Sequence, residues 1–256
     1  MPIIPLFSSG VVFKNLVLLS DEDLKSNILS EIITGEKIGT YCVYENDKYL
    51  TVNDEISTTL TKDSNGYKLN GQKKYVLFGD VSDYFAVLAN SQEGLMFVLV
   101  NKDSKGLEIK QTSSLDQTRP MCEINMKDIK ISNNEIMIDS DSCAKSWEKV
   151  KNISLGYLAM EQVGGAQACL DMSTMYAKER IQFGRPIGSF QAIQHICANM
   201  LVQLESAKSV AYSAVRTDTS DDLEVEMSAM LAKSYCSEVF NKIAGDNIQV
   251  LSLIHI

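Results

Sequence analysis

The sequence predicts an α+β protein in which three parts follow one another: a short helical segment, a domain of short antiparallel strands forming a small barrel or sandwich, and a bundle of long helices. Three changes of pattern support this prediction. Apolar residues have helical spacing over about 10–34, alternate with a period of two over about 38–138, and return to long helical stripes from Trp147. We place the three parts at residues 1–35, 36–142 and 143–256.

The first part is predicted to be helical and to end at a glycine. The run Ser20-Asp-Glu-Asp suits the start of a helix from Leu24 to Ile33, and Gly35 suits its end. The opening residues MPIIPLFSSG are apolar but have no basic stretch before them, and no run approaches the ~20 apolar residues of a membrane span. We therefore expect a cytoplasmic protein.

The second part is predicted to be a series of short strands. Thr58–Lys62 and Tyr67–Leu69 suit a hairpin around the turn Asp63–Gly66, and Asn70-Gly71 suits a second tight turn because both residues tolerate positive φ. Turn residues at regular spacing favour a small barrel or sandwich. Further strands are expected at Tyr84–Leu88, Leu95–Val100, Leu107–Gln111 and Cys122–Met126.

The third part is predicted to contain three long helices. The first covers about Lys149–Arg180, the second opens at Ser189, and the third opens at Ser220 and continues towards Gly245. Steps of three, four and seven residues give the second helix an apolar stripe. The stripe consists of Phe190, Ile193, Cys197, Met200, Leu204, Ala207, Ala211 and Val215.

Composition and charge exclude several classes of function. The chain has 256 residues, 45% of them hydrophobic, and a net charge of −9 with a pI near 4.8. A general nucleic-acid-binding protein needs a basic face, so this balance argues against one. Six cysteines are scattered without C-x-x-C spacing and the two histidines lie far apart, which favours free thiols and no metal site.

The segment between the first two long helices, Glu179 to Gln191, reads ERIQFGRPIGSFQ. A plain helix connection needs a glycine and a few polar residues, but this segment combines cations, aromatic faces and side-chain amides. Such a set suits a ligand with phosphates and an aromatic base. The alternative is an ordinary connection whose aromatic rings pack and whose arginines lie in water.

The segment and its surroundings closely resemble the acyl-CoA dehydrogenase family. The signature covers Tyr176 to His195, and the helices on either side agree at Ala159–Ala166 and Met200–Ala207. Earlier matches are Ile33–Gly39, Gly66–Lys73 and Leu115–Arg119. The resemblance implies an N-terminal helical domain, a middle β domain and a C-terminal four-helix bundle that forms tetramers. It also implies an FAD enzyme that removes hydrogens from the α and β carbons of an acyl-CoA thioester.

The resemblance also implies a set of cofactor-binding positions. Matching residues of the signature would hold the pyrophosphate and adenosine of FAD across a subunit interface: Arg180, Gln182, Phe183, Phe190 and Gln191. Backbone groups of the β domain would contact the flavin at Tyr41, Val43, Tyr75 and Val76. The family's Thr-Glu-Pro and Gly-Ser-Asp motifs are replaced, and only Glu45 remains of the first. Leu77 and Phe78 stand where the family has a hydroxyl and an amide.

The catalytic base implied by the family is missing from its expected position. In one branch of the family it lies on the first bundle helix, where this chain has Ser154, and in the other it lies beyond the last residue of this sequence. Glu161 is interpreted as a structural polar residue. Asn152 and Leu155 match substrate-contacting positions. His195 is expected to pack or hydrogen-bond, His255 to have no functional role, and both ends of the sequence to be cut relative to the family.

Three functions remain open from the sequence. The first is FAD-dependent dehydrogenation of an acyl-CoA, with electrons passed to an electron-transfer flavoprotein, by a homotetramer. The second is a catalytically degenerate subunit that completes the FAD site of an active paralogue in a heterotetramer. The third is an acyl-CoA oxidase, which shares the fold.

Overall fold

The computed structural model describes residues 5–45, 56–64, 66–216 and 222–252. The chain divides into two compact units, Met1–Lys151 and Asn152–Ile256, and helix α3 (Ser140–Glu179) begins in the first and continues in the second. Each unit has its own hydrophobic core. Among the described residues, none of the helices combines the length and apolarity that crossing a bilayer requires.

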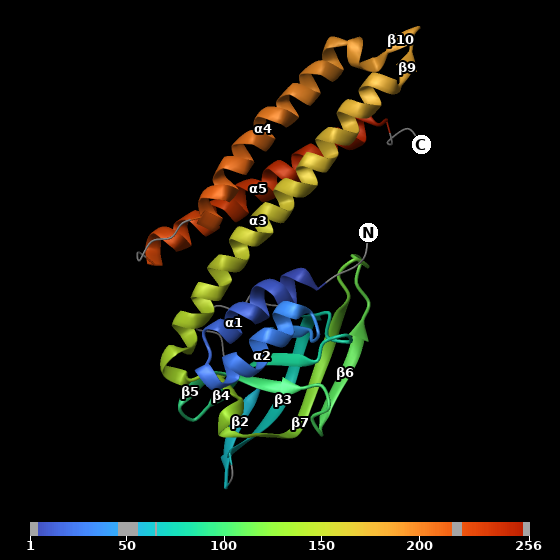
Figure 1. The fold of residues 1–256 in the computed structure, drawn as a ribbon. Helices are drawn as coiled ribbons and strands as arrows, with labels where there is room; N and C mark the ends of the chain where they lie inside the picture. Colours follow the sequence, from blue (N-terminus) through green and yellow to red (C-terminus); the bar gives the residue numbers. More distant parts are fainter. Residues whose placement is uncertain (1–4, 46–55, 65, 217–221, 253–256) are drawn as a thin grey trace. The chain divides into compact units, whose positions relative to one another are not determined.

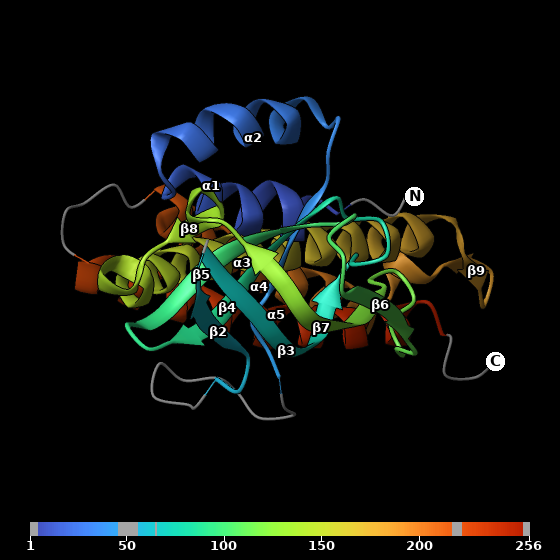
Figure 2. The ribbon, with the colours of Figure 1, turned by 90° about the horizontal axis from the view of Figure 1, so that it is seen from below.

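The helical start of the first unit consists of a π-helical segment and two α-helices. A π-helical segment, η1 (Leu6–Phe13), leads into α1 (Lys14–Leu18), and α2 (Glu22–Thr34) follows. Ser20 does not cap α2 as expected, because its hydroxyl donates to the carbonyl of Val17 at 2.7 Å and so closes α1. Gly35 ends α2 with φ of 75°, as the sequence predicts. Figures 1 and 2 show both helices on one face of the sheet.

The β part of the first unit is one mixed sheet. The predicted hairpin and the four later strands are confirmed, and β1 and β8 are added at the ends. The strands are β1 (Gly39–Cys42), β2 (Thr59–Asp63), β3 (Gly66–Leu77), β4 (Tyr84–Ser91), β5 (Gly94–Asn101), β6 (Leu107–Thr112), β7 (Met121–Ile131) and β8 (Ile136–Ile138), with a 3₁₀ turn, η2 (Asn133–Glu135), before β8. Their order is β6-β7-β3-β2-β4-β5-β8, with β1 beside β4.

Two features of this sheet correct the expected antiparallel barrel or sandwich. Strand β4 pairs in parallel with both β1 and β2, so the sheet is mixed. No pairing closes the strand order into a barrel within the described residues. The α+β class itself is confirmed.

The predicted second turn at Asn70-Gly71 is wrong. Strand β3 continues through both residues and pairs with β7, and a register shift between Leu69 and Gly71 marks a bulge. Gly71 has φ of 150°, and a Cβ built on it would lie 2.7 Å from the Cα of Thr58. The glycine is required by a bulge and by close backbone contact, not by a turn.

The two faces of the sheet bury different clusters. One face packs against η1, α1 and α2 through a core that includes Phe13, Leu16 and Phe97, with Trp147 from the start of α3 beside it. The other face buries Leu60, Leu69 and Ile124 together with the other residues of a second cluster. Side chains of β3 therefore pack into the second cluster. The expected flavin-contacting positions Tyr75 and Val76 lie on the same strand.

The second unit consists of α3, α4 (Gln191–Arg216) and α5 (Asp222–Val250), which lie side by side in Figure 1. The three predicted helices are confirmed, although α3 starts earlier, α4 starts at Gln191 and α5 continues past Gly245. The predicted start at Ser220 lies outside the described residues. Each helix contributes buried residues in steps of four, three and four, the spacing of coiled-coil packing. They are Ala159, Val163, Ala166 and Leu170; Met200, Leu204, Ala207 and Ala211; and Ala232, Cys236, Val239 and Ile243.

Polar contacts also join α3 to α5. The hydroxyl of Ser173, which has no exposed surface, donates to Oδ1 of Asn247 at 2.7 Å. Three turns earlier on α3, the amide of Gln162 donates to Oγ of Ser237 at 3.0 Å. Because a buried polar group needs its partner, these bonds fix the register of the two helices.

Candidate functional site

The segment between α3 and α4 is a short antiparallel hairpin. Strand β9 (Ile181–Gln182) pairs with β10 (Arg185–Pro186), and a 3₁₀ turn, η3 (Ile187–Ser189), leads into α4. Its loop is Phe183-Gly184, with φ of 54° and 76°. Positive φ at both loop residues is the pattern of the tight hairpin turns that match strand twist. Phe183 is sterically strained at this positive φ because it has a side chain, and it is 91% exposed.

Aromatic rings and cations gather at this hairpin. The rings of Phe183 and Phe190 meet edge to face with centroids 6.1 Å apart, and Cζ of Arg185 lies 4.2 Å from the centroid of Phe190. Arg180 is exposed, and no ion pair involves it in the part of the chain that the structure describes. We call the following residues the hairpin cluster: Arg180, Gln182, Phe183, Arg185, Phe190 and Gln191.

The hairpin cluster fits the nucleotide half of FAD chemically. The guanidinium of Arg180 is available to a pyrophosphate, and the exposed amides of Gln182 and Gln191 supply hydrogen-bond donors. Phe183 and Phe190 offer aromatic surface to an adenine ring, which stacks well on such faces. All five predicted nucleotide-binding residues thus lie on one hairpin and its flanks. Arg185 joins them, although it was not among the predicted positions.

The four predicted flavin-contacting positions of the β domain lie on β1, on the residues after it and on β3. Val43 and Val76 are each 1% exposed, so their side chains belong to the core. Tyr41 is largely buried, with its ring 6.4 Å from that of Trp147. Tyr75 is 42% exposed and has φ of 56° at a register shift of β3. These positions can offer a flavin backbone groups and the exposed Tyr75 side chain with its ring and hydroxyl, whereas the Val43 and Val76 side chains are apolar and buried.

Part of that backbone is already in use. The carbonyl of Val43 accepts from Nζ of Lys73 at 3.2 Å, and the carbonyl of Leu77 accepts from the hydroxyl of Thr40 at 2.7 Å. The carbonyl of Tyr44 accepts from the backbone N–H of Lys74 at 2.8 Å. Contacts to a flavin here would depend on the remaining N–H groups, because Leu77 and the buried Phe78 have no polar side-chain atoms.

A buried ion pair lies directly beside these positions. Nζ of Lys73 is 2.6 Å from Oε1 of Glu45, and the two side chains are 0% and 5% exposed. The Glu45 carboxylate also accepts from the Ser57 N–H and hydroxyl at 2.6 and 2.5 Å and from the Thr58 N–H at 3.0 Å. Glu45, which the sequence matches to the family's Thr-Glu-Pro motif, is thus held by contacts within the chain and does not face solvent.

The environment of the pair shifts the pKa values of both Glu45 and Lys73. Burial alone raises the pKa of Glu45, but hydrogen bonds from Lys73, Ser57 and Thr58 outweigh it and bring the pKa to about 2. Burial lowers the pKa of Lys73, against the pull of the Glu45 carboxylate. The multiple donors make the charged carboxylate the stable form at neutral pH.

The predicted substrate and base positions lie at the start of the second unit, on α3. Asn152 is 7% exposed, and its Oδ1 has no hydrogen-bond partner among the described residues. Ser154 is 8% exposed and Leu155 is half-buried. A serine hydroxyl does not act as a base without a neighbouring one, so this position lacks the chemistry of a carboxylate. Glu161, two turns on, is exposed.

Two histidines and six cysteines complete the chemically reactive residues considered from the sequence. His195 is exposed on α4, so its ring is not packed within the described residues, and the expected hydrogen-bonding role stays a prediction; His255 lies outside the described residues. All six cysteines are free, and four of them are buried. Reasoning from the sequence missed Lys73 and Arg185. Lys73 could have been found, because it occupies an inward position of an alternating strand and therefore needs a carboxylate partner.

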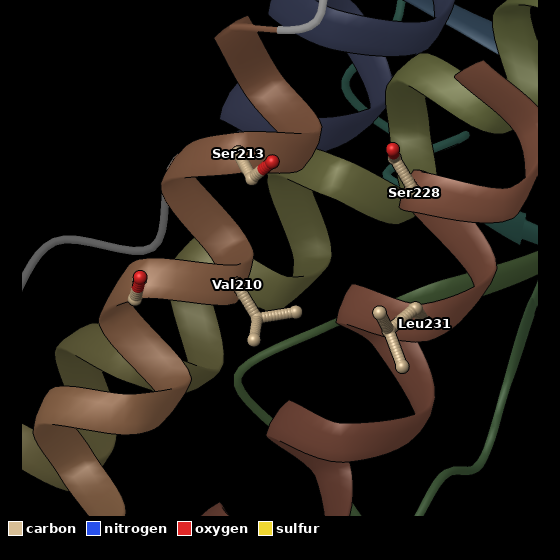
Figure 3. Close-up of a pocket in the computed structure, with 5 residues that line it drawn as sticks. Val210, Ser213, Ser228 and Leu231 are labelled. Atoms are coloured by element: carbon tan, nitrogen blue, oxygen red, sulfur yellow. The ribbon is translucent and has the colours of Figure 1, made fainter. Parts of the chain in front are cut away.

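Two cavities of the described residues contain none of the predicted site residues. One of about 260 Å³ lies between α4 and α5 and is lined by Val210, Leu231 and three serines (Figure 3). The other, of about 420 Å³, lies between α2 and the strands β4 and β5. The hairpin cluster and the Glu45–Lys73 region therefore remain as two candidate regions, one in each unit.

Comparison with known proteins identifies matching families in both units. The model of the acyl-CoA dehydrogenase middle domain matches residues 45–129, and that of the C-terminal domain matches residues 155–253. A curated relative from Rattus norvegicus, "Short/branched chain specific acyl-CoA dehydrogenase, mitochondrial", is 28% identical over 229 residues. The match covers 85% of this chain and 51% of the relative.

Solved structures show the same fold. Butyryl-CoA dehydrogenase from Megasphaera elsdenii superposes with a TM-score of 0.89 at 22% identity, over 96% of this chain and 66% of that one. A structure described as the FAD complex of PigA has a TM-score of 0.86 at 25% identity, over 96% and 66%. This chain thus spans about half the length of the rat relative and about two thirds of each of these structures. With family matches in both units and this shared fold, the chain belongs to the acyl-CoA dehydrogenase family.

Proposed function

We propose that this chain is part of an FAD-dependent enzyme that dehydrogenates an acyl-CoA thioester between its α and β carbons. The hairpin cluster is the observation that supports this most directly. On one short hairpin it presents a guanidinium that forms no ion pair with the described residues, a second guanidinium over an aromatic ring, and two exposed amides. That chemistry suits a dinucleotide with a pyrophosphate and an adenine, and FAD supplies the hydride acceptor when bound.

In this proposal the chain's own residues bind and orient the cofactor and the substrate. Arg180 neutralises the pyrophosphate, Gln182 and Gln191 hydrogen-bond to the nucleotide, and Phe183 and Phe190 cover the base. Arg185 holds the Phe190 ring in place by its contact at 4.2 Å. Backbone groups near Tyr41, Val43, Tyr75 and Val76 face the flavin ring, while Asn152 and Leu155 line the substrate side.

The partners belong to the same proposal. They are an acyl-CoA substrate, an electron-transfer flavoprotein as acceptor, and further copies of the chain in a tetramer. A reducing, cytoplasmic location is proposed as well, and it is supported by the six free thiols. An acyl-CoA oxidase would use the same site and differ only in passing electrons to oxygen.

A second candidate is a degenerate subunit that completes the FAD site of an active paralogue. Ser154 favours it, because this buried hydroxyl occupies the position of one of the family's two alternative carboxylates. The absence of polar side chains at Leu77 and Phe78 favours it too. In this case the hairpin cluster serves a partner's flavin and the chain itself performs no proton abstraction.

The visible absorption spectrum of the purified protein distinguishes the candidates. Oxidised flavin bands that are bleached by an acyl-CoA under anaerobic conditions support the dehydrogenase. A colourless protein that acquires flavin only when mixed with a paralogue supports the degenerate subunit. Protein that takes up FAD neither alone nor in a mixture would overturn both candidates.

A matched pair of variants tests the role of the hairpin cluster. We expect both variants to weaken FAD binding roughly tenfold: Arg180→Ala because a charged contact to the pyrophosphate is lost, and Arg185→Ala because the Phe190 ring loses the cation that holds it. Arg216→Ala is the control, because Arg216 also lies over an aromatic ring, that of Tyr212 at 5.5 Å, but at the other end of α4. Equal losses in all three variants would contradict a specific role for the hairpin.

A further inference from the structure

The buried ion pair joins three segments of the first unit that are distant in sequence. Lys73 on β3 donates both to Glu45, 28 residues earlier, and to the carbonyl of Val43. Glu45 in turn accepts from Ser57 and Thr58, which lie 12 and 13 residues later in the chain. The pair therefore ties the residues after β1 to β3 and to the residues before β2.

The same pair connects both backbone stretches proposed to face the flavin. Val43 belongs to the first stretch, and its carbonyl is 3.2 Å from Nζ of Lys73. Tyr75 and Val76 belong to the second and follow Lys73 by two and three residues on the same strand. A backbone hydrogen bond from Lys74 to Tyr44 lies between them at 2.8 Å. Displacing Lys73 would therefore move the two stretches relative to each other.

Stability alone does not account for such a pair. Removing two charges from water costs several kcal/mol per ion, and an apolar pair of the same volume often gives equal or greater stability. The pair instead specifies how the three backbone segments are arranged, because its hydrogen bonds are satisfied in only one arrangement. Glu45 receives four donor contacts, from Lys73, Ser57 and Thr58, so little freedom is left to it.

We propose that Lys73 and Glu45 are positioning residues, which hold the backbone at Val43 and at Tyr75–Val76 in the arrangement that receives the flavin ring. This inference rests on the proposed function. Leu77 and Phe78 have no polar side chains with which to hold the flavin. The proposal therefore assigns the positioning of the flavin-facing backbone to the buried ion pair. Neither residue contacts the reacting atoms in this proposal. Both act through the backbone that they hold.

The test uses the double variant Glu45→Leu/Lys73→Met, which removes both charges and leaves none unpaired. We expect this variant to unfold less easily than Lys73→Met alone, in which the buried Glu45 carboxylate loses its counter-charge, although in the double variant the Ser57 and Thr58 N–H groups lose their acceptor. Two further readouts are hydrogen exchange of the amides of Ser57, Thr58 and Lys74, and the dissociation constant for FAD measured by flavin fluorescence.

The double variant should lose exchange protection at these amides and bind FAD at least about tenfold more weakly, a factor that corresponds to about 1.4 kcal/mol. The control is Asp63→Asn/Lys68→Met, which removes an exposed ion pair with a 3.2 Å contact on the same hairpin and should change neither readout.

Two results would separate failure of the inference from failure of the proposed function. A double variant with wild-type stability, unchanged amide protection and unchanged FAD affinity would overturn the positioning role and leave the function intact. If the unmodified protein binds no FAD, the proposed function fails. Amide exchange then still decides whether the pair orders these segments, and unchanged protection would reject that too.

Discussion

Four donor contacts converge on the carboxylate of Glu45, and only one of them comes from the lysine that neutralises it. Each backbone N–H that binds a carboxylate stabilises its ionised form and opposes the cost of burial. The result at this residue is a carboxyl group whose pKa lies well below its ordinary value although its side chain is almost inaccessible. The stability of the first unit is therefore linked to the ionisation of Glu45.

The first prediction concerns the stability of the protein at acidic pH. Because the folded pKa of Glu45, about 2, lies below its ordinary value of 4.5, its contribution is complete above pH 4.5 and is lost as the pH falls towards 2. The pKa difference corresponds to a contribution on the order of 3 kcal/mol. Denaturant unfolding should show the free energy of unfolding falling in this window, and Glu45→Gln should flatten the fall. A parallel pH dependence in protein and variant would contradict the linkage.

Parts of the site could be predicted at the residue level and parts could not. The residues of the hairpin were identified because Arg180, Phe183 and Gln182 combine types that an ordinary connection does not need. Leu69 and Lys73 are both buried and lie four residues apart on β3, so the alternation indicates that Lys73 faces inwards, but it does not identify the carboxylate that Lys73 meets. Its partner Glu45 lies 28 residues earlier in the chain, so the pair itself became visible only in the structure.

At the scale of the element, two adjacent glycines of α3 have different roles. A Cβ built on Gly164 meets nothing within 4 Å, whereas one built on Gly165 would lie 2.8 Å from the ring of Phe240 on α5. The first glycine only lowers the helix propensity. The second allows α3 and α5 to approach closely.

The second prediction follows from this contrast. Gly164→Ala should raise the free energy of unfolding by about 0.5–1 kcal/mol through helix propensity. Gly165→Ala should lower it by roughly 1 kcal/mol, because displacing the packed Phe240 ring outweighs the same gain. Chemical denaturation of both variants measures the difference. The idea fails if the two substitutions change stability in the same direction.

The third prediction concerns the bond between Ser173 and Asn247, which joins α3 to α5 at 2.7 Å. Asn247→Ala leaves the fully buried Ser173 hydroxyl without this partner and should cost about 1–3 kcal/mol. Ser173→Ala/Asn247→Leu removes both polar groups and should recover most of that loss. A double variant as unstable as the single one would show that the packing volume, rather than the unpaired hydroxyl, sets the cost.

The elements themselves were largely predictable because their signals are local. Gly35 ends α2 through its left-handed conformation, and the apolar stripe of α4 is buried at Met200 and Leu204 as its spacing predicts. The Asn70-Gly71 turn was wrong for a physical reason: glycine serves equally at turns and at bulges. Pairing of β4 with two parallel neighbours was also beyond the sequence, since it depends on contacts between distant segments.

At the scale of the whole molecule, the chain consists of two units with separate cores, joined through the continuous helix α3. The only tryptophan, Trp147, packs in the first unit, with its ring 5.7 Å from that of Phe97. The second unit consists of long helices around its own core. Two optical signals therefore report mainly on different units.

The fourth prediction is that unfolding is not a single transition. Trp147 fluorescence and far-ultraviolet circular dichroism should give different denaturant midpoints, because each unit has its own core. Asn247→Ala should shift the dichroism midpoint and leave the fluorescence midpoint nearly unchanged. Coincident curves that shift together in the variant would mean that α3 couples the units into one cooperative system.

The strand order leaves β6 at one end of the sheet, with β7 as its only partner among the described residues. Its inward residues, Leu107 and Ile109, cover the core, whereas Glu108 and Lys110 alternate with them and remain exposed. The unpaired N–H and C=O groups of an edge strand can pair with a strand of another chain. Charged side chains on the edge strand raise the free-energy cost of that pairing. Glu108 and Lys110 therefore disfavour edge-to-edge pairing of this sheet with a strand of another chain.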